Sequence, residues 1–139
     1  MQRREFNQHL QRSAIAMALA HWLSAVAAPA NRPRHWQTNP FALGVASGRP
    51  RAASVVLWTR LLFSEEDRAT GTEALRVKVE VFADAALKHR VQKVEVATDE
   101  TRGHSVHVHL QQLQPSTHYW YRFTQGNATS DVGHTRTAP

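Results

Sequence analysis

Three histidines in the second half of the chain, His104, His107 and His109, are the residues whose type and spacing could bind a metal ion. Imidazole nitrogen is a common ligand for zinc, copper and nickel. Residues two apart on a β-strand share a face, so His107 and His109 could reach one ion, whereas His104 would need a bulge to join them. Apolar residues alternate with these histidines, so we favour an exposed polar strand face for His107 and His109 over a functional metal site.

The sequence patterns of the common catalytic centres are missing. The chain has no cysteine, which excludes a disulfide scaffold, a thiolate zinc site and a cysteine nucleophile. It contains no phosphate-binding Gly-Lys-Ser or Gly-Lys-Thr loop, no G-x-S-x-G elbow and no H-E-x-x-H motif. The acidic run at residues 65–67 lies in a polar stretch. We therefore assign no catalytic residue, no cofactor-binding residue and no metal ligand in this chain.

The composition is that of one ordinary globular domain. The chain has 139 residues, of which 42% are hydrophobic and 20% are charged. Its net charge of +6 comes from 17 basic and 11 acidic residues and favours solubility. One small basic cluster, Arg32, Arg34, Arg49 and Arg51, has no interleaved stacking aromatics. We therefore expect no nucleic-acid partner.

The start of the chain has the layout of an export signal. Arg3 and Arg4 provide a charged start, residues 13–28 are mostly apolar, and small residues follow. The paired arginines resemble a twin-arginine signal, and a general secretory signal with two arginines by chance is the alternative. Cleavage fits after Ala27 or after Ala30. It would leave the mature part in the periplasm or outside the cell, with no membrane attachment.

Apolar and polar residues alternate with a period of two through most of the mature part, which is typical of strands with one buried face. The expected strands are residues 75–81, 94–96, 106–110 and 119–123, a central strand in 54–62, and weaker candidates at 41–46 and 132–137. About seven short strands in about 100 residues predict an all-β immunoglobulin-like or fibronectin type III-like sandwich. Another all-β fold is the alternative.

Polar, glycine-rich and proline-rich segments separate these strands. We expect turns at residues 47–50, 99–103 and 125–127. Residues 64–72 are polar and predict a loop, and residues 84–88 could form a single helical turn.

Residues 113–119 resemble the L-x-P-x-T-x-Y segment of fibronectin type III domains. Leu113 would plug one end of the core, Pro115 would fix the bend, and Tyr119 would begin the next strand. In such domains the tyrosine forms a corner in which its hydroxyl group bonds to the upstream backbone. The motif predicts a fold and says nothing about activity.

Several segments together resemble the N-terminal domain of the PhoD-like phosphatases, also called the alkaline phosphatase D family. They occur in the family's order, at similar spacing, and cover residues 39–139. The matching segments are residues 39–50, 55–61, 104–108, 113–123 and 132–139. Two positions depart from the family pattern: Arg49 stands where Asp is usual, and His134 stands where Arg is common.

The resemblance implies an exported phosphodiesterase and phosphomonoesterase whose metallophosphatase domain would hold calcium and iron. None of the motifs for that catalytic domain lies in the matched region. We expect an export signal at residues 1–30, a linker at 31–38 and the sandwich domain at 39–139. The chain would be a truncated member or an N-terminal fragment, not catalytic alone, with the metallophosphatase domain as its partner. Trp58 and Trp120 are candidates for the contact face.

Two other functions fit the residues. The first is a free-standing fibronectin-like binding module for protein or glycan in the periplasm. The second is a metal-binding protein that uses the histidine-rich strand, which we favour least. The sequence does not define an oligomeric state.

Overall fold

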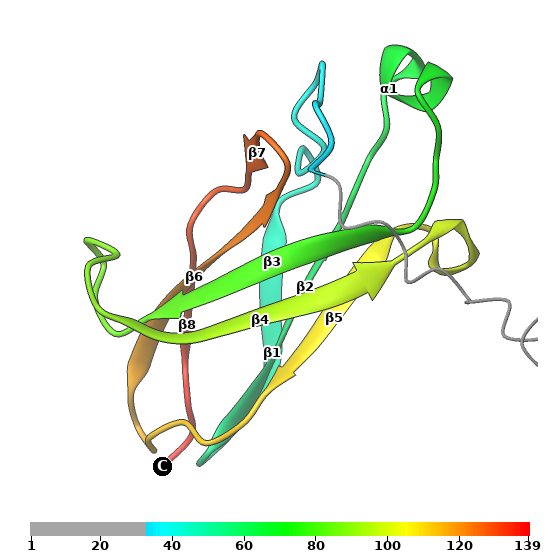
Figure 1. The fold of residues 1–139 in the computed structure, drawn as a ribbon. Helices are drawn as coiled ribbons and strands as arrows, with labels where there is room; N and C mark the ends of the chain where they lie inside the picture. Colours follow the sequence, from blue (N-terminus) through cyan, green and yellow to red (C-terminus); the bar gives the residue numbers. More distant parts are fainter. Residues whose placement is uncertain (1–32) are drawn as a thin grey trace, which may run out of the picture.

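A computed structural model describes residues 33–139, and the expected export signal at residues 1–30 lies outside the described residues. The described part is a sandwich of two antiparallel sheets (Figure 1). Its elements are β1 (Val45–Arg51), β2 (Ser54–Arg60), α1 (Glu65–Ala69), β3 (Leu75–Phe82), β4 (Arg90–Thr98), η1 (Glu100–Arg102), β5 (Ser105–Leu110), β6 (His118–Gln125), β7 (Ala128–Thr129) and β8 (Gly133–Arg136).

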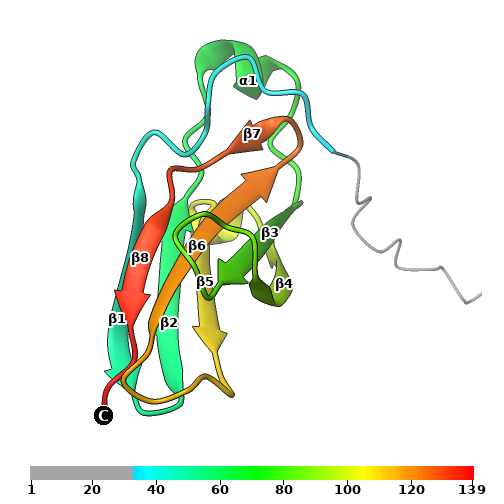
Figure 2. The same cartoon turned by 90° about the vertical axis from the view of Figure 1, so that its left-hand side faces the viewer.

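The order of the strands confirms the predicted fold class. One sheet has the order β1-β2-β5, and the other has the order β4-β3-β6-β7 with β8 also paired to β6. Strands that are far apart in sequence, such as β2 and β5, are therefore neighbours. This crossover between two sheets is the Greek-key arrangement of fibronectin type III-like sandwiches. Viewed from the side, the strands form two layers, and the end of the chain lies beside the lower end of β1 (Figure 2).

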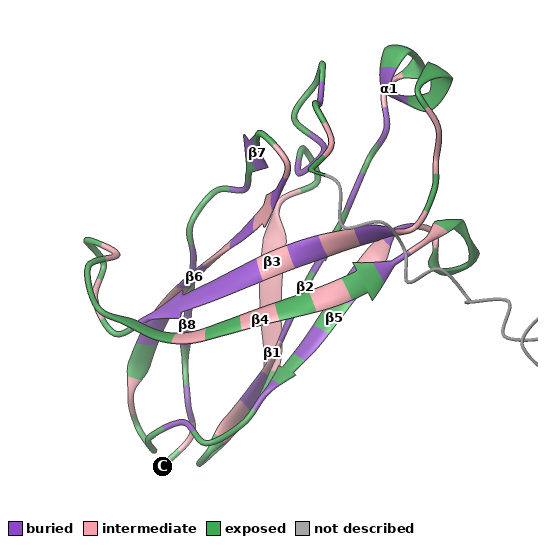
Figure 3. Cartoon of the chain, in the orientation of Figure 1, coloured by how far each residue is buried: buried purple, intermediate pink, exposed green. Residues whose placement is uncertain are grey.

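The core lies between the sheets and is built from alternate residues of each strand. Strand β3 lies between β4 and β6 and carries the most continuous buried stretch (Figure 3). Full burial of each large apolar side chain contributes about 1.5–3 kcal/mol relative to exposure. The largest fully buried apolar side chains are Tyr121, Phe123, Leu57, Leu110, Val55, Val77, Val79, Val81 and Val106.

The segment expected as a linker at residues 31–38 packs onto the sandwich where it is described. Trp36 is 4% exposed and belongs to the core. Its indole Nε1–H donates to Oε1 of Gln125 over 2.8 Å, and its backbone N–H donates to Oδ1 of Asn127 over 2.8 Å. Its ring meets Phe63 edge to face, with 4.9 Å between the ring centroids. The packed domain therefore begins before residue 39.

The first strand differs from its prediction. The weak strand expected at residues 41–46 begins only at Val45, and the turn expected at residues 47–50 lies inside β1. A register shift between Gly48 and Arg51 accommodates Pro50, which has no N–H for the ladder. Strand β1 is an edge of its sheet, where a bulge and a proline are tolerated.

The loop expected at residues 64–72 contains the short helix α1. Ser64 is its N-cap, and its hydroxyl oxygen accepts from the backbone N–H of Asp67 over 3.1 Å. A serine followed three residues later by an acidic residue is a helix-start signal that the loop prediction ignored.

The helical turn expected at residues 84–88 is a single hydrogen-bonded turn that does not continue as a helix. The N–H of Leu87 donates to the carbonyl oxygen of Asp84 over 3.1 Å, and the carboxylate of Asp84 accepts from the N–H groups of Lys88 and His89. Leu87 has a φ of +56° there, which no right-handed helix allows.

The expected tyrosine corner is present. Tyr119 is buried, and its hydroxyl oxygen accepts a hydrogen bond from the backbone N–H of Gln114 over 2.9 Å. The bond joins the loop before β6 to the start of that strand, as the motif at residues 113–119 predicts.

A buried carboxylate holds the N-terminal segment against α1. Asp67 accepts hydrogen bonds from the backbone N–H groups of Gln37 and Thr38, over 2.9 and 3.3 Å, and from the hydroxyl of Ser64 over 2.9 Å. Burial alone raises the pKa of Asp67, but these hydrogen bonds and the charge of Arg34 outweigh it and lower that pKa. The ionised carboxylate is therefore a structural anchor.

We expect Tyr119→Phe to lower the free energy of unfolding by about 1–3 kcal/mol, because the N–H of Gln114 loses its acceptor. Denaturant unfolding of both proteins measures this difference. An unchanged midpoint would show that the corner does not stabilise the fold.

We expect Asp67→Ala to cost about 2–4 kcal/mol of unfolding free energy, because it removes the acceptor for two backbone N–H groups. Glu66→Ala on the exposed side of α1 is the matched control and should change the stability by less than about 0.5 kcal/mol.

The lowered pKa of Asp67 also predicts a pH dependence. Its stabilisation is complete above the unfolded-state pKa of about 4 and is lost as the pH falls towards the lower folded-state pKa. Glu80, Asp84 and Asp99 also have lowered pKa values, so the relevant quantity is the difference between wild type and Asp67→Ala. That difference should shrink below about pH 4. A difference in unfolding free energy that stays constant from pH 7 to pH 2 would contradict the role of the Asp67 carboxylate as a structural anchor.

Candidate interaction surfaces

The three histidines singled out in the sequence do not converge. His107 and His109 are exposed on the outer face of β5, as expected. His104 is buried, with its ring 4.5 Å from the ring of Phe63 and its Nε2 3.4 Å from the carbonyl oxygen of Thr72. Within residues 33–139, no group of three or more His, Cys, Asp or Glu side chains is placed to hold a metal ion.

An aromatic platform lies on the outer face of the β1-β2-β5 sheet. Trp58 is 38% exposed and is stacked with His107, with 6.4 Å between ring centroids and 25° between ring planes. Gly48 on the neighbouring strand lies beneath the indole. A Cβ atom there would be 3.0 Å from the indole Cζ3, so a larger residue would push the ring away from the sheet. The platform thus depends on a glycine in β1.

A basic groove continues from this platform towards the β1–β2 turn. It has a volume of about 790 Å³ and is lined by Arg49, Arg51, Ala52, Ala53, Ser54, Val56, His109, Gln111 and Gln112. Neither Arg49 nor Arg51 forms an ion pair with another of the described residues. Residues 45–63 contain no Asp or Glu, so the arginine charges are uncompensated along the strands that carry them. The two arginines therefore make this end of the sheet electropositive.

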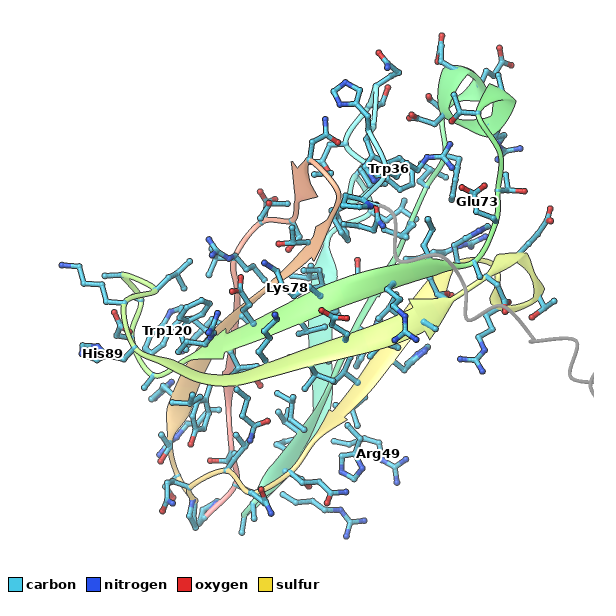
Figure 4. The ribbon with its side chains drawn as sticks, viewed as in Figure 1. Trp36, Arg49, Glu73, Lys78, His89 and Trp120 are labelled. Carbon is cyan, nitrogen blue, oxygen red and sulfur yellow. The ribbon has the colours of Figure 1, made fainter. Side chains whose placement is uncertain are left out.

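Two backbone features also mark the β1–β2 end of the groove. Arg49 has a φ of +50°, in the left-handed region that Gly, Asn and Asp adopt most easily. Its side chain extends beside the lower end of β5 (Figure 4). The backbone N–H of Ala138 donates to the carbonyl oxygen of Arg51 over 3.1 Å, so the last residues of the chain are fixed beside the groove.

The outer face of the second sheet has a charge network at its centre. Glu80 is 5% exposed and accepts from Arg90 over 3.0 Å and from Arg122 over 3.1 Å, with Lys78 at 3.7 Å. Burial alone raises the pKa of Glu80, but the three cations outweigh it and lower that pKa. The guanidinium of Arg122 also lies over the ring of Phe82, at 5.5 Å. The carboxylate is satisfied by its neighbours, so this network is structural.

A cluster that the sequence analysis missed lies beside that network. It consists of His118, Trp120 and His134 on β6 and β8, with Trp120 marked in Figure 4. Nδ1 of His118 and Nε2 of His134 are 2.9 Å apart, and the Trp120 and His134 rings are stacked with centroids 4.9 Å apart. These histidines are distant in sequence. Only the pairing of Trp120 with His134 in the sheet reveals that they meet.

The fold defines a fibronectin type III-like domain. Its described residues carry exposed aromatic and basic patches and no group of three or more potential metal ligands. The chain belongs to the family of the PhoD-like phosphatase N-terminal domain, whose model matches residues 25–139. No helix of the described part is long and apolar enough to span a membrane.

One relative and one solved structure support the assignment. The chain is 38% identical over 142 aligned residues to alkaline phosphatase D of Bacillus subtilis (strain 168), covering 99% of this chain and 24% of that relative. It also matches a solved structure of PhoD at 40% identity and a TM-score of 0.71, covering 76% of this chain and 20% of that one. The chain therefore corresponds to the N-terminal domain of these longer proteins.

A more distant likeness concerns the fold alone. The sensor domain of an anti-sigma factor from Pseudobacteroides cellulosolvens matches with a TM-score of 0.53 at 12% identity, covering 68% of this chain and 91% of that domain. Sandwiches of this kind carry unrelated functions, so this likeness gives no functional information.

Proposed function

We propose that this chain is the accessory domain of an exported alkaline phosphatase D-type phosphodiesterase and phosphomonoesterase, and that it is not catalytic on its own. The main support is the 38% identity to alkaline phosphatase D of Bacillus subtilis (strain 168). The match covers 99% of this chain but only 24% of that relative. The reacting groups, with calcium and iron, would belong to a separate metallophosphatase domain. That domain is the proposed partner.

The chemistry of the described residues supports a non-catalytic role. The buried carboxylates of Asp67 and Glu80 are engaged by hydrogen bonds and ion pairs, which leaves neither available as a base. The buried His104 packs on Phe63 and faces a carbonyl oxygen.

The basic groove is the proposed contact surface for the metallophosphatase domain. The backbone N–H of Ala138 donates to Arg51, and the carbonyl oxygen of Ala138 accepts from the N–H of Ser116 over 2.9 Å. Any domain joined to residue 139 would therefore begin next to the groove. The unpaired charges of Arg49 and Arg51 favour a partner surface with acidic residues. The Trp58 platform would extend the same contact.

We further propose export to the periplasm or beyond, by a twin-arginine-like signal in residues 1–30. The support is the charged start at Arg3 and Arg4, the apolar stretch and the small residues around Ala27 and Ala30.

We expect the purified chain to hydrolyse neither p-nitrophenyl phosphate nor bis(p-nitrophenyl) phosphate, because it would lack the metal centre. We also expect it to bind, in calorimetry, the metallophosphatase domain of a longer family member prepared without its own N-terminal domain. Arg49→Ser with Arg51→Ser should weaken that binding by about tenfold, equivalent to about 1.4 kcal/mol.

The matched control removes two other exposed arginine charges, with Arg68→Ser on α1 and Arg102→Ser on η1, away from the β1–β2 turn (Figure 1). This control should bind as the wild type does. Measurable turnover by the chain alone would contradict the accessory role, and equal losses in the two double variants would contradict the groove as the contact.

A further inference from the structure

His118 and His134 lie on one face of the sheet although 16 residues separate them. Strands β6 and β8 are antiparallel neighbours, and Trp120 pairs directly with His134. Residues two apart on a strand share a face, so His118 is the diagonal neighbour of His134 on the outer face. Both histidines are exposed to solvent.

Their rings meet edge to edge. The ring planes are within 8° of parallel, the centroids are 5.0 Å apart, and Nδ1 of His118 is 2.9 Å from Nε2 of His134. Two facing nitrogens at that distance share one proton, because one imidazole donates its N–H to the lone pair of the other. The two donor atoms are thus already held together in the absence of any ion.

The nitrogen separation also suits metal coordination. Two imidazole nitrogens bound at about 2.05 Å with an angle of about 90° at the ion are about 2.9 Å apart. The structure gives 2.9 Å for this pair. Binding requires that the donor imidazole carries its proton on its other ring nitrogen instead, by exchange with solvent, and that the rings rotate so that both lone pairs turn to one point outside the sheet. Both rings are exposed, so solvent accommodates this rotation.

The surroundings define which ions fit. Trp120 stacks on His134 and lies 6.4 Å from His118, so its indole supports the pair from one side. Arg136 stands opposite His118 in the β6–β8 register, and neither β6 nor β8 carries an Asp or Glu. Water or a small anion would complete the coordination. A site with two nitrogen ligands at a right angle suits tetragonal Cu²⁺ first and Ni²⁺ or Zn²⁺ less well.

We propose that His118 and His134 form an exposed two-histidine site for late divalent transition metals, with Cu²⁺ preferred. This site goes beyond the accessory role proposed above and does not depend on it. It differs from the arrangement of His107 and His109, whose exposed rings are not paired with each other in the structure.

The test is calorimetric titration of the full chain with Cu²⁺ at pH 7.4 in a buffer that does not bind metal. We expect one saturable site, with binding weakened at least tenfold by His118→Asn and by His134→Asn. The double variant His107→Asn, His109→Asn removes two exposed histidines outside the site and should bind as the wild type does. Circular dichroism checks that every variant is folded, and either single variant is sufficient if the other fails to fold.

Trp120 provides a second readout, because bound Cu²⁺ quenches the fluorescence of a nearby indole. We expect quenching that saturates at the calorimetric stoichiometry and is lost in His134→Asn. Trp120→Phe should lose most of the quenching while keeping Cu²⁺ binding in calorimetry. Binding should also weaken as the pH falls, because protons compete with the ion for imidazole nitrogen.

Three results would overturn the site. They are the absence of saturable Cu²⁺ binding by the wild type, Cu²⁺ binding that both single variants leave unchanged, and equal losses in the His107–His109 control.

Discussion

The inner faces of the two sheets can be shielded from water only by each other, and the rest of the structure depends on that mutual burial. Val77, Val79 and Val81 of β3 and Phe123 of β6 are fully buried between the sheets. Their alternation leaves the opposite side chains facing outwards. The core therefore fixes both outer faces as rigid surfaces, where Trp58 and the His118–His134 pair are presented. The buried Asp67 and the Tyr119 corner close the two ends of this arrangement.

Local patterns were sufficient to predict most of the fold. Apolar residues alternate along β3 and β5 because one face of each strand is buried, so both strands can be predicted from the sequence. The tyrosine motif at residues 113–119 likewise predicts the corner. Other features depend on tertiary contacts that no local pattern contains. Trp36 lies in a polar segment, and only its contacts with Gln125 and Phe63 make that segment part of the domain.

The surfaces were harder to predict than the fold. The cluster of His104, His107 and His109 was conspicuous because its members are close in sequence, yet strand alternation and burial separate them. His118 and His134 were not singled out because they are far apart in sequence. The pairing of β6 with β8 brings them together. The charge of the groove could be suspected from Arg49 and Arg51, but its position beside residue 138 required the backbone geometry.

We propose that this sandwich serves a larger hydrolytic domain through the end that carries the basic groove. Amide hydrogen exchange, compared between the free chain and the chain bound to a metallophosphatase domain of the family, tests it most directly. We expect slower exchange around Arg51 to Ala53 and around Gln111 and Gln112, with the outer face of β4 unchanged. Slower exchange confined to β4, or no change anywhere, would contradict it.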